Sequence, residues 1–266
     1  MRPKLATLPA VRPNAGIRAA YQRRLDRLIG QMSRSVAYWL KAQYRAKPPE
    51  LASDASPAVE LQKTMGRLSR QWQDKFDDLA PEMAEHFAKA SADRVDGALK
   101  ASLKKAGFAV EFKMTAAQND VLQATIAENV ALIKSIASEY LSEVEGLVMR
   151  SVSAGRDLGP LTDALEQRYG ITRRRAARIA LDQNNKASAS LTRARYLDAG
   201  ITQAIWVHSA GGKTPRPSHV KAGRERTVYD VKTGWFDPDE RAFILPGQLI
   251  SCRCVARAIL PGLPKR

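Results

Sequence analysis

The sequence has few cysteines and few aromatic residues. The only cysteines among 266 residues are Cys252 and Cys254, and a single intervening residue is a poor geometry for a disulfide between them. A disulfide scaffold is therefore excluded. Aromatic residues make up 6% of the chain and hydrophobic residues 44%, which favours helices packed through alanine and aliphatic side chains over an aromatic-rich β-sandwich.

Long apolar runs and familiar catalytic motifs are also absent. No stretch of about 18 apolar residues occurs, so we expect no membrane span. The first 13 residues lack the apolar segment of a secretory signal, so we expect the protein to stay in the cytosol unless a particle carries it out. The sequence contains no P-loop, dinucleotide-binding glycine fingerprint, nucleophile elbow or His-Glu-x-x-His helix. We therefore expect that the protein is not an enzyme.

Basic residues are in large excess. Lysine and arginine number 43 against 27 acidic residues, which leaves a formal net charge of +16. Such a charge attracts polyanions and makes their binding salt-dependent, so nucleic acid is the first partner to consider. Basic patches that dock on acidic neighbouring proteins, or that keep the chain in solution, explain the charge equally well.

Apolar periodicity predicts helices over most of the chain. A basic first helix covers residues 16–46, and Pro48, Pro49 and small polar residues up to Pro57 then form a linker. Further helices are expected from there to residue 78, from Pro81 to about 107, and from Thr115 to about 153. Residues 108–112 form a strand or an extended link. A short helix over 161–169 ends at Gly170, and another, capped by Thr172, runs through residue 195.

The character of the sequence changes after Gly200. A strand is expected over residues 201–207, then a region rich in glycine, proline and turns, and a closing strand over 252–260. The fold class is therefore mainly α, with extended helical N-terminal and middle regions and a small, turn-rich α+β domain at the C-terminal end. We expect three regions: a basic helical region (1–110), a linking region (111–170) and the C-terminal domain (171–266).

The helix over residues 171–196 is a candidate surface for nucleic acid or a partner protein. It carries seven basic residues, and the candidate contacts among them are Arg173, Arg174, Arg175, Arg178, Lys186 and Arg193. Arg178 and Asp182 are spaced for a contact between successive turns. A solvated or internally paired helix is the alternative to a DNA-facing one, and the sequence does not separate the two.

The Cys252-Arg253-Cys254 triplet is a candidate metal site. It lies downstream of His219 in a region poor in large apolar residues, and such regions often gain stability from a bound metal. Thiolate and imidazole ligands suit zinc, and His208 is a candidate fourth ligand. The alternative is that the two cysteines are small, partly buried residues on a strand, with Arg253 turned outward.

The order of these landmarks resembles that of the phage Mu F-like head morphogenesis family over residues 171–260. The similar stretches read YGITRRRAARIALDQNNKASASLTRARYLDAGITQAIWVHSAGG, RPSHVKAGRE and LPGQLISCRCVARAI. The family's landmarks fall on Arg178, Asp182, Gln183, Lys186, Gly200, Ile201, Trp206, Arg216, Pro217, His219, Gly223, Pro246, Gly247, Cys252, Arg253 and Cys254. Some relatives carry a Cys-x-x-Cys pair where this chain has Arg216 and His219, a departure from their metal pattern.

The resemblance implies a minor head protein of a tailed bacteriophage. Such a protein is expected in the virion, inside the head or at the portal vertex, and in the host cytoplasm during assembly. Its expected partners are the portal protein, the major capsid or scaffolding protein, and double-stranded DNA bound without sequence specificity. A role in DNA packaging or ejection follows from the same resemblance.

Two other functions compete with this one. A zinc-dependent hydrolase or nuclease would use His219, Cys252 and Cys254 as ligands and Glu225 or Asp230 as base, because a catalytic zinc keeps one coordination position open. No acid and base pair in a recognisable spacing supports it. A sequence-specific DNA-binding regulator would need a recognition-helix motif, and none is found.

Overall fold

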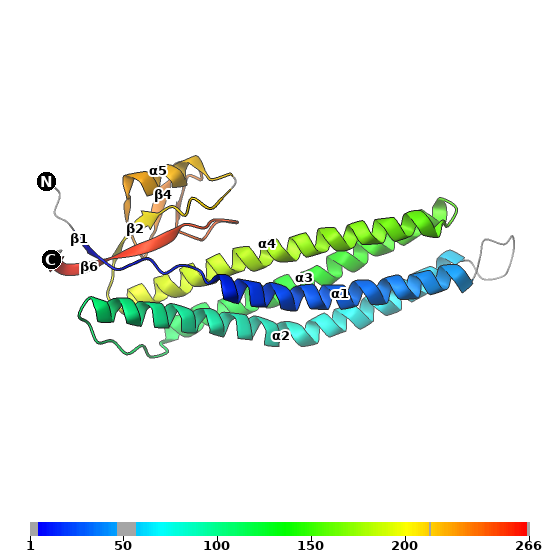
Figure 1. Cartoon of the computed structure of the whole chain (residues 1–266), viewed down its shortest axis with the longest axis horizontal. Coiled ribbons are helices and arrows are strands. Elements are labelled where there is room, and N and C mark those ends of the chain that lie inside the picture. Colours follow the sequence, from blue (N-terminus) through cyan, green and yellow to red (C-terminus); the bar gives the residue numbers. More distant parts are fainter. Residues whose placement is uncertain (1–4, 47–56, 213, 265–266) are drawn as a thin grey trace. The chain divides into compact units, whose positions relative to one another are not determined.

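The computed structural model describes residues 5–46, 57–212 and 214–264. Its fold is mainly α with a small C-terminal α+β region, as the composition and periodicity predicted (Figure 1). Within the described residues, four long helices precede the α+β region: α1 (Ala15–Ala46), α2 (Pro57–Lys105), α3 (Ala116–Ser153) and α4 (Leu158–Asp198). The linker expected between Pro48 and Pro57 lies outside the described residues except for Pro57, where α2 begins.

The chain divides into two compact units that alternate along the sequence. The helical unit comprises Ala19–Ala84 and Ala127–Ala180, and the α+β unit comprises Met1–Arg18, Glu85–Ile126 and Leu181–Arg266. Each long helix contributes a segment to both units. The three consecutive regions expected above do not follow this division, since residues 170 and 171 lie inside α4. Whether those regions fold independently stays a prediction.

The helical unit is a four-helix arrangement held by a continuous aliphatic core. Its largest fully buried side chains include Leu25, Ile29, Met32, Leu40, Leu61, Met65, Phe76 and Tyr140. An ion pair joins each neighbouring pair of helices: Arg24–Glu82, Lys134–Asp77, Arg168–Glu139 and Arg173–Asp26. These four contacts close a ring in the order α1, α2, α3, α4. This order is the up-and-down topology that short connections produce.

The prediction that a helix ends before Pro81 is wrong, because helix α2 continues through this residue. Residues 57–105 form one helix with Pro81 inside it, where we had predicted two helices. Proline in a helix interior removes a hydrogen bond and costs about 3 kcal/mol. Phe76 and Ala80 before the proline and Met83 and Ala84 after it are all buried, while Pro81 faces solvent. Burial along one uninterrupted face therefore outweighs the lost bond.

Helix α4 likewise runs through the expected stop at Gly170. The Thr172 hydroxyl does not cap a new helix but donates to the carbonyl of Arg168, 3.0 Å away in the preceding turn. Leu165 and Ala176, on either side of Gly170, are both buried. A glycine inside a helix costs about 1 kcal/mol, which packing of this kind offsets.

The predicted helix after Thr115 and the extended link over 108–112 are confirmed. The Thr115 hydroxyl oxygen accepts the backbone N–H of Gln118 at 3.2 Å, which is the contact of an N-cap. No strand occurs over residues 108–112, all of which are described.

The α+β unit is built on an antiparallel sheet in the order β1-β6-β2-β3. These strands are β1 (Leu5–Thr7), β6 (Val255–Pro264), β2 (Gln203–Val207) and β3 (Val228–Asp230), and a separate hairpin pairs β4 (Trp235–Asp237) with β5 (Ala242–Ile244). The short helix α5 (Pro217–Glu225) follows β2. Strand β6 begins at Val255, so the prediction that the closing strand starts at residue 252 is wrong. The two cysteines lie in the segment just before β6, residues 247–254, which we call the cysteine turn.

Candidate metal centre

The cysteine turn is held against α4 by a hydrogen bond and by close backbone packing. Ser251 has a φ of 61°, in the left-handed region, and its backbone N–H donates to Asp182 Oδ1 at 2.6 Å. Gly247, with a φ of 82°, lies so close to α4 that a Cβ there would stand 2.7 Å from the Cβ of Ala189. A side chain at position 247 would therefore separate the turn from the helix. Asp182 and Gly247 thus fix where Cys252 and Cys254 lie.

His219 reaches the same place from the first turn of α5. Pro217 occupies the first helical position, where its fixed φ suits the helix and no N–H is needed. The His219 ring is 3% exposed and packs edge-on against Trp206 of β2, with ring centroids 5.0 Å apart. At the other end of α5, Gly223 allows a close approach, because a Cβ there would stand 2.5 Å from the Cβ of His208.

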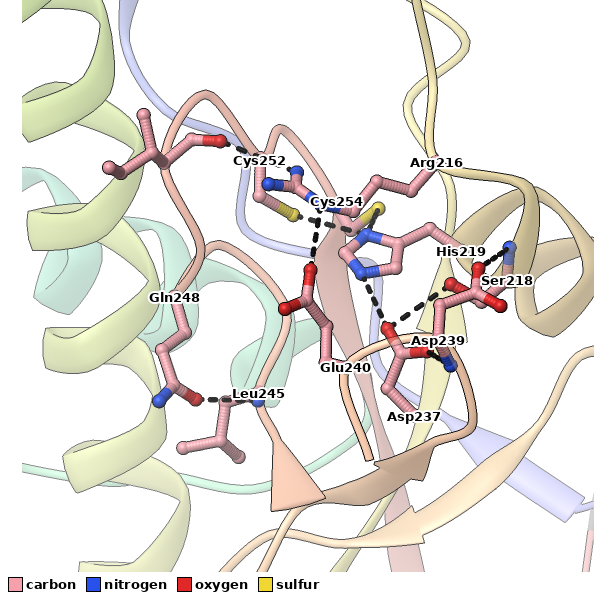
Figure 2. A network of polar contacts seen from close by, with 11 residues as sticks. Arg216, Ser218, His219, Asp237, Asp239, Glu240, Leu245, Gln248, Cys252 and Cys254 are labelled. Atoms are coloured by element: carbon pink, nitrogen blue, oxygen red, sulfur yellow. Dashed lines mark hydrogen bonds and ion pairs between the residues drawn. The ribbon is translucent and has the colours of Figure 1, made fainter. Parts of the chain in front are cut away.

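The three side chains converge on one point (Figure 2). His219 Nδ1 lies 3.6 Å from Cys252 Sγ and 3.7 Å from Cys254 Sγ, and the three ligand atoms are within 4.8 Å of one another. Zinc bonds of about 2.3 Å to sulfur and 2.05 Å to nitrogen, at tetrahedral angles, place a sulfur and a nitrogen ligand about 3.6 Å apart. The observed separations therefore match those of a zinc site.

A buried carboxylate contacts the second ring nitrogen of His219. Asp237 at the end of β4 is 0% exposed, and its Oδ2 lies at ion-pair distance from His219 Nε2, 3.2 Å away. Asp237 also accepts the Ser218 hydroxyl at 3.1 Å and the Asp239 backbone N–H at 2.9 Å. A carboxylate on the second ring nitrogen orients a metal-binding histidine and leaves Nδ1 free to bind the ion.

The two thiols influence each other's ionisation. The pKa of Cys252 is lowered to about 4, chiefly by a hydrogen bond from Cys254 and further by His219. The pKa of Cys254 is raised, first by its hydrogen bond with Cys252 and then by burial. The pair therefore retains one shared proton, since a second buried negative charge would be unfavourable without a nearby cation.

His208, the expected fourth ligand, is not among the side chains that gather here. Its Nδ1 accepts the Ala210 backbone N–H at 3.2 Å. Arg216 ion-pairs with Glu240 at 3.3 Å and donates to the Ile250 carbonyl at 3.3 Å, which ties the start of α5 to the cysteine turn. Arg253 donates to the Gly211 carbonyl. The described residues thus supply three protein ligands.

The structure also locates the basic residues singled out on α4. Arg173 pairs with Asp26, and Arg175 contacts Glu139 at 3.0 Å. Lys186 pairs with Asp182 at 3.1 Å, and among the described residues no ion pair joins Arg178 to Asp182.

Arg193 donates to the carbonyls of Val231 at 2.8 Å and Lys232 at 2.7 Å. Arg174 and Arg178 are exposed. Most of this basic set is therefore engaged within the protein, and its assignment to nucleic acid stays a prediction.

Sequence reasoning missed Asp237, Ser218 and Asp239. Asp237 is followed by Pro238 and Asp239, and this sequence reads as an ordinary turn. Only the fold of the β4–β5 hairpin buries its carboxylate against His219. Gln183 and Trp206, taken from the resemblance, are both buried, at 2% and 0% exposed.

Comparison with known proteins adds one relative. An uncharacterized protein of Haemophilus influenzae is 33% identical over 139 residues, which is 52% of this chain and 29% of the relative. The chain thus spans less than a third of that protein's length. No family model matches the chain, and no solved structure matches it. No described helix is long and apolar enough to cross a membrane.

Proposed function

We propose that this chain is a bacteriophage minor head protein whose C-terminal α+β unit is stabilised by a structural zinc ion. The observation that carries the proposal is the convergence of the family-like residues on one centre. Asp182 and Gly247 fasten the cysteine turn to α4, and Trp206 packs on His219. Landmarks that are scattered over residues 182–254 thus serve a single site, which is what a shared structural motif would require.

His219 Nδ1, Cys252 Sγ and Cys254 Sγ would hold the zinc ion. All three residues are buried, at 3%, 4% and 4% exposed, which favours a stabilising role over access for a substrate. Zinc bound only by the folded state contributes its binding free energy to stability. This contribution suits a unit whose strands β3, β4 and β5 have three residues each.

The long helices and the net charge of +16 support the assembly role. In this proposal the helices dock on the portal, capsid or scaffolding protein, and the basic surface lies against packaged DNA. Function in the virion needs no catalytic residues, and we propose none.

Two measurements test this proposal. Native mass spectrometry of the chain with the portal protein of the same phage should show a complex of defined stoichiometry, and the absence of any complex would overturn the assembly role. Elemental analysis should find one zinc ion per chain in the wild type and in His208→Ala, and none in His219→Ala. Equal zinc in all three proteins would overturn the metal site.

A zinc-dependent hydrolase is the second candidate, because three protein ligands leave a coordination position open. Its proposed bases are placed unfavourably. The Asp230 carboxylate accepts the backbone N–H groups of Thr233 and Lys232, both at 2.8 Å, and these bonds lower its pKa. A carboxylate that holds a turn in this way is a poor general base. Glu225 is exposed at the end of α5. Hydrolysis of a phosphodiester or peptide that is lost in both His219→Ala and Glu225→Gln would favour the enzyme.

A further inference from the structure

Five basic side chains form a band along α1, within the helical unit. They are Arg23, Arg27, Arg34, Lys41 and Arg45. At about 100° per residue, these positions fall within about 40° of one another around the helix axis. Four of the five are exposed and Lys41 is half-buried. We call this set the α1 basic face.

The α1 basic face lies opposite the apolar stripe of the same helix. Leu25, Ile29, Met32, Val36 and Leu40 are fully buried at 0% exposure. Because these residues hold α1 in the core of the helical unit, the basic face is directed to solvent. The face is thus a rigid array of cations, unlike a flexible basic tail.

Among the described residues, no acidic side chain is paired with this face. None of the five side chains has an ion-pair partner within the described part of the chain. Asp26, the one acidic residue within α1, pairs with Arg173, and Glu82 of α2 pairs with Arg24. This contrasts with α4, where Arg173, Arg175, Lys186 and Arg193 are engaged internally.

The length of the face suits duplex DNA. Arg23 and Arg45 are separated by 22 residues, or about 33 Å at 1.5 Å per residue. A duplex of about ten base pairs covers the same distance at 3.4 Å per base pair, so phosphates are available along the whole face. Arginine and lysine side chains both neutralise phosphate charge, so every residue of the face can contribute.

Other polyanions fit less well. A helix that lies on an anionic membrane must present its apolar side to the lipid, and that side of α1 is buried. Protein interfaces have a core depleted of charge, whereas the only large apolar side chain on this face is Tyr38, 67% exposed. The chemistry therefore favours a phosphate backbone.

We infer that the α1 basic face, and not the basic residues of α4, is the main surface by which this protein binds double-stranded DNA without reading its sequence. The inference rests on the DNA association in the proposed function and assigns it to a surface.

Fluorescence anisotropy of the full chain with a labelled duplex of about 30 base pairs, at several salt concentrations, tests the inference. The test variant replaces all five residues of the face with glutamine. The matched control replaces Arg94, Lys100, Lys104, Lys105 and Lys221, which are exposed in the α+β unit, and loses the same charge. Glutamine is a good helix former, so both variants should keep the helical circular dichroism of the wild type.

The test variant should bind at least about tenfold more weakly near 0.1 M salt, and its slope of log affinity against log salt should fall by about 0.9 per lost phosphate contact. The control should stay within about threefold of the wild type. A third variant, with the four arginines of the face changed to lysine, should bind nearly as the wild type does, because phosphate contacts depend mainly on charge.

Two results would overturn the inference. Equal weakening in the test variant and the control would show that only net charge matters, and the proposed DNA association would stand. If the wild type does not bind duplex DNA but binds phosphatidylglycerol vesicles or polyglutamate through this face, both the inference and the DNA association fail. The portal complex is measured separately and is affected by neither result.

Discussion

Replacing Asp237 with asparagine is the sharpest test of the candidate metal centre. The carboxylate is completely buried, and its Oδ2 lies 3.2 Å from His219 Nε2. Asparagine has the same shape but carries no charge and keeps only one acceptor oxygen. That oxygen cannot replace both carboxylate oxygens, which now accept the Ser218 hydroxyl and the Asp239 N–H. The substitution therefore weakens the contacts that orient the His219 ring toward the metal.

The expected loss is a factor of about 10 to 100 in zinc affinity, the usual result of removing a carboxylate from a metal-bound histidine. This corresponds to about 1.4 to 2.7 kcal/mol, since each factor of ten is worth about 1.4 kcal/mol. The cost is smaller than for losing a ligand, because Cys252, Cys254 and His219 are all still present.

Asp239→Asn provides the matched control. Its carboxylate lies two residues away and accepts the Ser218 backbone N–H at 3.2 Å, but no contact joins it to His219. Competition against a chromophoric zinc chelator measures the affinity of each protein, and helical circular dichroism confirms that each is folded. Asp239→Asn should stay within about threefold of the wild type. Unchanged zinc affinity in Asp237→Asn, or an equal loss in both variants, would refute the reasoning.

Three further predictions concern the α+β unit. Gly234→Ala should destabilise the unit by about 2 kcal/mol or more in urea unfolding, because φ is 94° there and a Cβ would stand 2.5 Å from the Ile244 carbonyl of β5. The control Gly97→Ala, in open space on α2, should instead stabilise the unit by up to about 1 kcal/mol. Equal effects of the two substitutions would contradict this reasoning. Asp96→Ala should cost about 2 to 3 kcal/mol in the same assay, because it removes both 2.7 Å bonds to the 4% exposed Arg195, and a loss below about 0.5 kcal/mol would argue against a buried pair. Burial raises the pKa of Tyr196 to about 12, so the folded state loses stability as the pH rises from about 10 to 12. Tyr196→Phe should reduce that loss of unfolding free energy by about 2 to 3 kcal/mol between pH 9 and 12. Parallel pH profiles of the wild type and the variant would contradict the role of this tyrosine.

The sequence predicts helices well where apolar residues recur periodically, and poorly where a proline or glycine interrupts the pattern. The buried stripe of α1 and the cap at Thr115 were both predictable, because spacing and capping act within a few residues. Pro81 and Gly170 each predict the end of a helix, since their local cost is known from the residue alone. Whether packing offsets that cost depends on the neighbouring helices, which a single segment does not reveal.

The candidate metal centre could be predicted in part. Cys252, Cys254 and His219 were identified from residue chemistry and from their turn-rich surroundings. His208 has the same chemistry, but its Nδ1 accepts the Ala210 N–H while α5 brings His219 to the cysteines. Asp237 was not predicted, because a buried carboxylate and a turn aspartate have the same sequence signature.

The sequence by itself determined the fold class, the excess of positive charge and the two residue types, cysteine and histidine, that could bind a metal, because these follow from composition and short-range spacing. Only the tertiary structure decided which basic residues are free and which polar groups meet. The arginines of α4 and α1 look alike in sequence, yet Arg173 and Arg175 have acidic partners from other helices. Ion pairs and metal ligands join residues distant in the chain, so their formation depends on how the elements pack.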